Sequence, residues 1–152
     1  MKKFKFSLEK ILDLKNQFLK NLKNDLMRLK LDLKNKEDEI NDLNRKIADT
    51  DAKYVEKTKE SISSVEIVSY KDYLDRLYME KKELFMQKRI IINKIENKKK
   101  DVISMNMEIS TLEKLREKKM DDYNYKVQKA EEQLIEEFIS MSSVFEKSSN
   151  NK

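Results

Sequence analysis

Glycine and proline are both absent from the 152 residues of this chain. Glycine supplies the positive φ angles that many turns and bulges need, and proline stops helices. Sandwiches, barrels and doubly wound sheets depend on frequent turns of this kind. The absence of glycine and proline therefore argues against all three folds. It favours long, uninterrupted helices.

Cysteine and histidine are absent as well. The chain therefore cannot form a disulfide, a thiolate or imidazole zinc site, a Cys–His pair or a Ser–His–Asp triad. Without glycine it also has no phosphate-cradling loop. We expect no enzyme activity, no catalytic residues, no cofactor and no small-molecule substrate.

Long apolar runs are missing too, because no stretch approaches the roughly 20 residues of a membrane span. The basic start Met1–Phe6 is not followed by the apolar block of a signal peptide. We expect a cytoplasmic protein that is peripheral on the cytoplasmic side of the cell membrane through its partners only.

What the chain has is charge, at 41% of residues, and two stretches of apolar residues at alternating intervals of three and four. This spacing is typical of coiled-coil helices. A few lysines and one threonine interrupt the rows without changing their phase. The first row is Leu22, Leu26, Leu29, Leu33, Lys36, Ile40, Leu43, Ile47, Thr50 and Tyr54, and the second is Ile67, Tyr70, Leu74, Leu77, Lys81, Leu84, Lys88, Ile91, Ile95, Lys98, Val102, Met105, Ile109 and Leu112.

The sequence predicts an all-α fold, a long two-helix antiparallel coiled-coil hairpin with an extended C-terminal helix. We expect helices over about 7–59 and 66–145, joined by a Ser-rich turn at 60–65. Ser7 is a candidate cap for the first helix, and Ser63 or Ser64 for the second. Residues 1–147 would form a single hairpin, and residues 148–152 a disordered tail.

A turn near residue 62 places residue i opposite about residue 124 − i. From about Met120 onward the second helix then has no partner in the chain. This overhang carries a broad apolar stripe of Leu134, Ile135, Phe138, Ile139, Met141, Val144 and Phe145. A wide apolar stripe on an unpaired helix predicts a binding partner.

The charges are distributed unevenly: residues 1–34 are basic, whereas residues 131–152 are acidic. A net charge of +5 and the run Lys98–Lys100 raise the question of nucleic acid. Acidic residues are interleaved almost everywhere, so we favour a solvated coiled-coil face. Glu131, Glu132, Glu136 and Glu137 lack the histidine or second carboxylate helix of a metal site, and their better use is recognition of a basic partner.

Aromatic residues cluster beside the predicted turn. Tyr70 lies on the apolar row and is expected to be core, while Tyr73 and Tyr78 lie beside it and Tyr54 across the hairpin. Tyrosine offers a large apolar area at low entropic cost, so exposed members of this cluster are candidate contacts.

Four blocks in order resemble the flagellar export protein FliJ family. Residues 4–12 resemble its opening F-x-F-x-L-E-x-(V/I)-L block, and residues 70–77 its Y-x-x-(Y/F)-(L/I)-x-x-L block. Residues 112–119, followed by Tyr123, resemble its L-x-x-L-(R/K)-E-K-K block. Residues 131–138 resemble its acidic C-terminal element, with Glu136 where the family more often has Asp.

The resemblance implies a non-enzymatic stalk that inserts into a hexameric flagellar export ATPase and couples it to the cytosolic part of the membrane export gate. Some members also bind export chaperones. It implies ring contacts at the chain ends, through Phe4, Leu8, Glu131, Leu134, Ile135, Glu136, Glu137, Phe138 and Met141. It implies gate contacts near the turn, through Tyr54, Tyr73, Leu77 and Tyr78.

Other classes of function fit the same pattern. The stalk of a virulence type III secretion ATPase would have the same shape. A generic coiled-coil scaffold or a nucleic-acid-binding coiled coil also stays open at this point, and co-purification with an ATPase would discriminate between them and a stalk.

Overall fold

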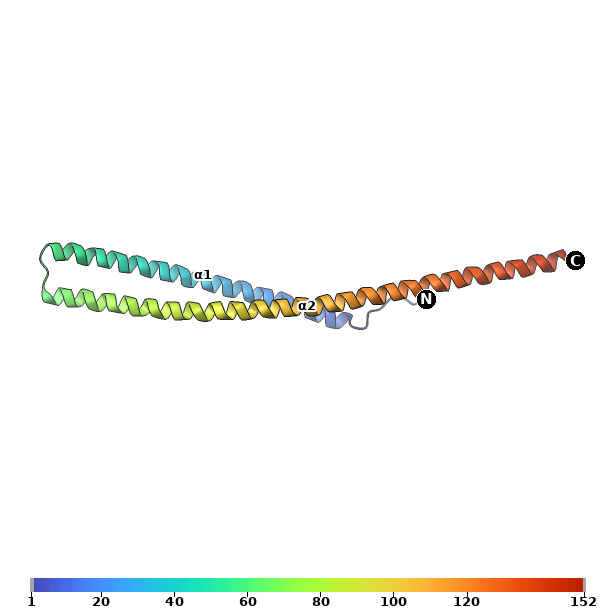
Figure 1. Ribbon diagram of the computed structural model, residues 1–152, viewed down its shortest axis with the longest axis horizontal. Helices are drawn as coiled ribbons and strands as arrows, with labels where there is room; N and C mark the ends of the chain where they lie inside the picture. The colour runs from blue at the N-terminus through green and yellow to red at the C-terminus, as the bar shows by residue number, and fades with distance from the viewer. Residues whose placement is uncertain (1, 152) are drawn as a thin grey trace. The chain divides into compact units, whose positions relative to one another are not determined.

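The computed structural model describes residues 2–151 and contains two long helices, α1 (Glu9–Lys59) and α2 (Ser64–Asn150) (Figure 1). No strand occurs within the described residues. The chain is all-α, and the two helices pack against each other, as the apolar rows predict. Within residues 2–151, neither helix is both long and apolar enough to cross a membrane.

The helices contribute to two compact units. The terminal unit contains the residues up to Phe18 and those from Met105 onward, and the turn unit contains Leu19–Ser104. In the turn unit α1 and α2 lie side by side, and a short connection joins them at one end (Figure 1).

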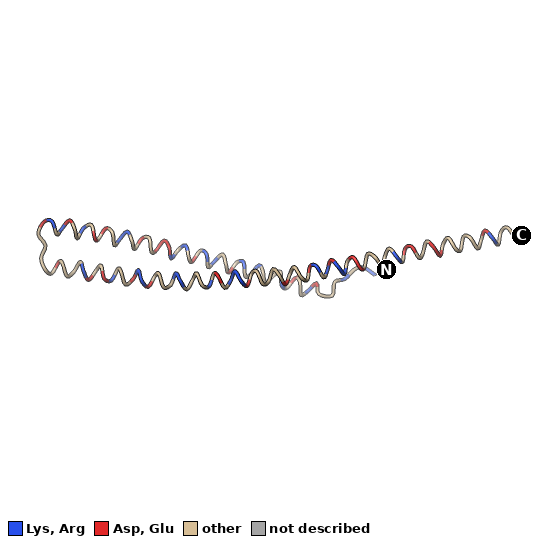
Figure 2. Tube along the Cα trace, in the orientation of Figure 1, with Lys and Arg blue, Asp and Glu red and all other residues tan. Residues whose placement is uncertain are grey.

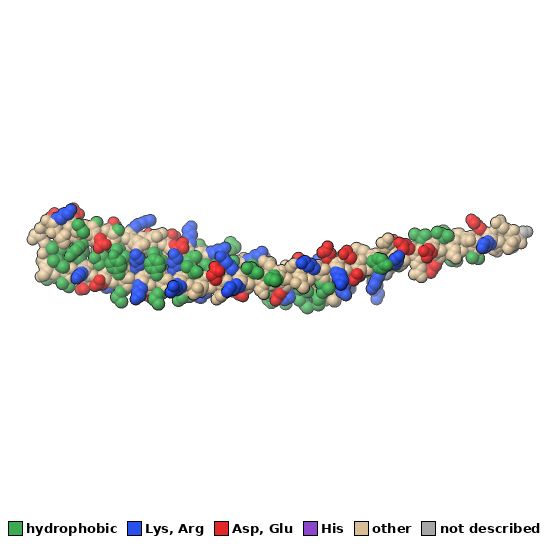
Figure 3. Space-filling view, in the orientation of Figure 1, with side chains coloured by type: hydrophobic (Ala, Val, Ile, Leu, Met, Phe, Trp, Pro, Cys, Tyr) green, Lys and Arg blue, Asp and Glu red, His purple; other side chains and the backbone are tan. Residues whose placement is uncertain are grey.

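The predicted apolar rows form the seam between the helices. Every residue of both rows is buried or half-buried. In the turn unit the buried cluster consists of Ile40, Leu43, Ile47, Leu77 and Leu84, with Leu74 packed against it, and apolar side chains fill the space between the two helices (Figure 3). Leu12 and Ile109 are the buried apolar residues of the terminal unit.

Ion pairs between the helices report the register of the seam. The turn unit has Lys88–Glu37 at 3.6 Å and Lys98–Asp25 at 3.8 Å. The terminal unit has Lys15–Glu108 at 2.8 Å and Arg116–Glu9 at 3.2 Å. In each pair the two residue numbers add up to about 124, so the predicted antiparallel register is confirmed inside both units.

The lysines of the seam place their ammonium groups at the edge of the seam. The side chains of Lys36, Lys88 and Lys98 are 26–28% exposed, and each ammonium group pairs with a carboxylate beside the seam. The aliphatic stems thus cover apolar neighbours while the charged heads stay solvated. This arrangement explains why these lysines leave the phase of the seam intact.

The turn closes without glycine. The Ser63 hydroxyl oxygen accepts a hydrogen bond from the backbone N–H of Glu66 at 3.3 Å, which confirms a serine cap for α2. At the end of α1 the N–H of Glu60 bonds to the carbonyl of Lys57 at 3.2 Å. No described residue has a positive φ angle, so the connection needs none of the conformational freedom that glycine provides.

The helix ends differ from the predicted ones at three places. α1 begins at Glu9 rather than Ser7, and α2 begins at Ser64 rather than residue 66. α2 also continues to Asn150, so the predicted disordered tail is wrong for residues 148–150. Serine and asparagine weaken a helix but do not stop it as proline does. Lys152, the last residue of that predicted tail, lies outside the described residues.

Candidate interaction surfaces

The start of the chain packs on α2 in the terminal unit. The rings of Phe4 and Tyr123 lie 5.7 Å apart between centroids, at an interplanar angle of 52°. The Tyr123 hydroxyl donates a hydrogen bond to the Lys2 carbonyl at 2.6 Å. Residues 2–6 are not helical, so an extended segment covers this part of α2.

This packing corrects the predicted start of the overhang. The sequence placed it at about Met120, but Met120, Tyr123, Val127 and Ala130 are all half-buried. The expectation extended only the helical seam and ignored the non-helical residues before it. Phe4 and Leu8, both expected to contact the ATPase ring, are half-buried here, and the aromatic ring of Phe4 packs against that of Tyr123.

We call residues 131–150 the C-terminal segment. Every one of these residues is exposed. Its apolar side chains are 60–72% exposed, and they are Leu134, Ile135, Phe138, Ile139, Met141, Val144 and Phe145. The predicted stripe is therefore uncovered by any described part of the chain.

Acidic residues recur along the C-terminal segment (Figure 2). Glu132 forms an ion pair with Lys129 at 3.3 Å and accepts a hydrogen bond from the Gln128 side chain at 3.4 Å, both within the same helix. Glu131, Glu136 and Glu137 have no ion pair with a described residue. Among residues 2–151 no three acidic side chains gather closely enough to hold a metal ion. The segment thus offers apolar contact area with unneutralised carboxylates beside it.

Near the turn the aromatic residues divide into packed and exposed ones. Tyr54 and Tyr70 pack at 5.7 Å between ring centroids, and the Lys57 ammonium lies 5.8 Å from the Tyr70 centroid. Tyr73 is 42% exposed and Tyr78 is 50% exposed. Tyr54 is half-buried and Tyr70 belongs to the seam, as predicted.

Leu77 is not available as a gate contact. It is only 5% exposed and belongs to the buried cluster of the turn unit. Its place in the apolar row already signalled this, since row positions face the partner helix. The two exposed tyrosines are five positions apart, which turns them about 140° from each other on a helix with 3.6 residues per turn. One flat partner surface cannot cover both.

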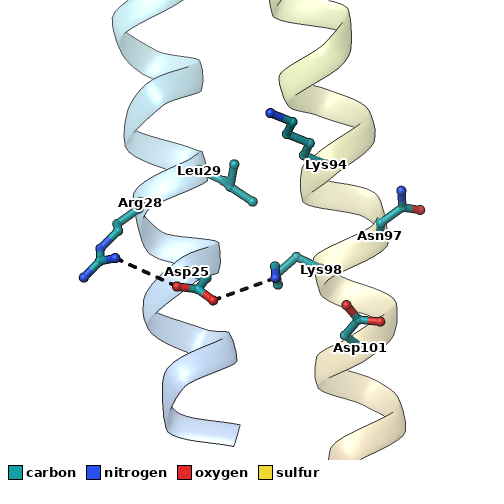
Figure 4. A pocket seen from close by; sticks show the side chains of 7 residues that line it. All are labelled: Asp25, Arg28, Leu29, Lys94, Asn97, Lys98 and Asp101. Atoms are coloured by element: carbon teal, nitrogen blue, oxygen red, sulfur yellow. Dashed lines mark ion pairs between the residues drawn. The ribbon is translucent and has the colours of Figure 1, made fainter. Parts of the chain in front are cut away.

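A hollow of about 440 Å³ lies beside the seam in the turn unit, lined by Asp25, Arg28, Leu29, Lys94, Asn97, Lys98 and Asp101 (Figure 4). Asp25 lies between two cations, with Lys98 at 3.8 Å and Arg28 at 4.0 Å. Its carboxylate is therefore used inside the hairpin. We regard the hollow as a feature of the seam, because the Asp25–Lys98 pair joins α1 and α2 across it.

Comparison with known proteins gives one family. The model of the family described as "Flagellar FliJ protein" matches residues 4–148. No match was found among curated proteins or among solved structures. Because the family match covers nearly all of the sequence, the chain belongs to the flagellar FliJ protein family, whose members are non-catalytic components of the flagellar export apparatus.

Proposed function

We propose that this chain is the stalk of the flagellar type III export ATPase: it inserts into the hexameric ring and couples the ring to the cytosolic part of the membrane export gate. ATP hydrolysis belongs to the ring. The observation that carries the proposal is the C-terminal segment, an exposed apolar stripe on a continuous helix in a chain of this family.

The ring contact is proposed on the C-terminal segment. Leu134, Ile135, Phe138 and Met141 supply apolar anchors, and Glu131, Glu136 and Glu137 supply charge for basic groups of the ring. Interface energy concentrates in a few well-packed residues near the centre of a contact. Phe4 and Leu8 have a supporting part in this proposal, because Phe4 packs on Tyr123 and holds the extended segment against α2.

The gate contact is proposed near the turn, around Tyr73. Tyr73 is exposed, while the Tyr54–Tyr70 pair and the buried Leu77 stiffen the helices beneath it. Because Tyr78 points about 140° away, it belongs to a different surface and serves as a control. Export chaperones are further partners, and the protein works at the cytoplasmic side of the cell membrane through these contacts.

The ring contact is tested by binding of the purified export ATPase to full-length variants. Ile135→Ala and Phe138→Ala should each weaken ring association by about 1–3 kcal/mol, the range typical of interface anchors. Ile103→Ala is a matched control, since Ile103 and Ile135 are 60% exposed on the same helix. Equal losses for Ile103→Ala and Ile135→Ala, or no loss for either, would overturn the ring assignment.

The gate contact is tested separately with the soluble part of the gate. Tyr73→Ala should weaken gate binding and leave ring binding intact, while Tyr78→Ala changes neither. If Tyr73→Ala and Phe138→Ala reduce both activities in parallel, a single shared surface or general unfolding replaces the two-surface mechanism.

A further inference from the structure

A second exposed apolar surface lies on α2 in the turn unit, and the proposed function does not use it. Phe85, Met86 and Ile92 are 46%, 63% and 39% exposed. Together with Lys82 and Arg89 they line a shallow hollow of about 530 Å³. We call these five residues the basic–apolar patch.

The patch has the spacing of a helix-binding stripe. Counted from Lys82, its other residues follow at three, four, seven and ten positions along α2, so they lie on one side of the helix. The seam residues Leu84 and Ile91 each lie one position before a patch residue, and they face α1 instead. The patch therefore runs beside the seam as a separate row, in the position where a third helix packs against a two-helix coiled coil.

The charges of the patch are available for a partner. Neither Lys82 nor Arg89 forms an ion pair with a described residue. Lys88, at the edge of the hollow, places its ammonium 6.0 Å from the Phe85 ring centroid and pairs with Glu37 at 3.6 Å. Two unpaired cations beside exposed apolar side chains call for a helix with carboxylates beside an apolar stripe.

An anionic membrane surface fits the patch less well. Glu83 follows Lys82 directly and lies about 100° from it around the helix, beside the patch, and its carboxylate would be repelled by anionic lipids. A membrane-binding helix carries lysine and arginine across its polar face instead. The interleaved charges favour a protein partner with a defined register.

The chain itself contains a helix of the required chemistry. The C-terminal segment combines Leu134, Ile135, Phe138 and Ile139 with the unpaired carboxylates of Glu136 and Glu137. Patch and segment both belong to α2, whose helical structure is continuous from Ser64 to Asn150. Two stretches of one continuous helix cannot pack against each other. The segment that binds the patch must therefore come from another molecule.

We propose that the basic–apolar patch binds the acidic C-terminal segment of a second copy of this chain. Each copy carries both surfaces, so the contact produces self-association. It covers apolar side chains that are exposed in the single chain. The proposal does not depend on the ring assignment, because it concerns contacts between copies only.

The test measures the mass of the full-length protein by sedimentation velocity at increasing concentration, with no ATPase present. The wild-type chain should associate, and added salt should weaken the association because exposed charge pairs are screened. Two charge reversals, K82E/R89E in the patch and E136K/E137K in the segment, should each weaken it about tenfold or more. K118E/K119E is the matched control for the patch variant, since it makes the same charge change at exposed positions of α2 outside the patch.

An equimolar mixture of the two reversed variants decides the pairing. The acidic segment of K82E/R89E then meets the intact patch of E136K/E137K, and the two reversed surfaces also attract each other, so association should return. Circular dichroism must show equal helicity for all variants. A monomeric wild-type protein at every concentration overturns the proposal, and so does a mixture that stays monomeric. Binding to phosphatidylserine vesicles that is lost in K82E/R89E, with the protein monomeric throughout, would assign the patch to lipid.

Discussion

Two stretches of α2 carry similar apolar rows and have opposite environments. In the turn unit Leu77 and Leu84 are 5% and 9% exposed, whereas in the C-terminal segment Leu134 and Phe138 are 65% and 72% exposed. Both stretches belong to one unbroken helix. The difference shows that an apolar row indicates a helix that packs against a partner. Where the partner is a helix of the same chain, the row stabilises the fold; where no such helix is present, the row is available to bind another molecule.

A cross-link tests which residues face each other in the covered stretch. Leu29→Cys combined with Ile95→Cys places two thiols at a layer of the seam in the turn unit, where the register pairs these positions. We expect an intramolecular disulfide that raises the free energy of unfolding by about 4 kcal/mol, the chain-entropy value for a loop of this length. Thermal melting of oxidised and reduced protein measures the gain.

The control for this cross-link is the pair Leu31→Cys and Ile95→Cys, because Leu31 is 58% exposed and lies off the seam. It should not form an intramolecular bond. Exclusive formation of intermolecular disulfides by the seam pair would contradict the antiparallel hairpin.

The comparison predicts opposite results for the same kind of truncation. Leu77→Ala should lower the free energy of unfolding by about 3 kcal/mol, because it leaves a cavity in the buried cluster. Phe138→Ala removes a larger side chain but should change stability by less than about 0.5 kcal/mol, because that side chain is exposed. Chemical denaturation followed by circular dichroism compares the two variants. Similar losses would mean that the C-terminal segment is covered within the molecule.

A local effect, confined to one end of the hairpin, is expected where the non-helical start of the chain meets α2. Phe4→Ala removes the ring contact with Tyr123, a pair worth about 1 kcal/mol beyond its buried area. Trypsin should then cleave after Lys5 faster, while the melting temperature stays nearly constant. Phe18→Ala is the control, since Phe18 is 45% exposed. Unchanged cleavage in Phe4→Ala would show that other contacts hold the segment.

Much of this fold could be predicted because a coiled coil has a fixed period. The rows located both helices, and the position of the Ser-rich break set the register that Lys88–Glu37 and Arg116–Glu9 confirm. The packing of Phe4 on Tyr123 could not be predicted, because an extended segment has no period that relates it to a helix.

Surface positions were harder to predict than seam positions. Leu77 was expected as a gate contact although its row position indicated burial, and the row was the better guide. Lys82 and Arg89 carried no sequence signal that separates them from the many other basic residues of a solvated face. Their significance depends on three exposed apolar neighbours, which the side-chain exposures reveal.

The register also determines the order in which the contacts form during folding. Tyr54 and Tyr70 meet close to the turn, whereas Lys15 and Glu108 are 93 residues apart in sequence, and Lys2 and Tyr123 are 121 apart. The entropy lost on closing a loop rises with its length, and local contacts form faster than distant ones. We therefore expect the hairpin to zip from the turn outward, so that the contacts around Tyr123 form last and open first. The helix next to the C-terminal segment is then the part of the hairpin that exchanges its amide hydrogens most readily.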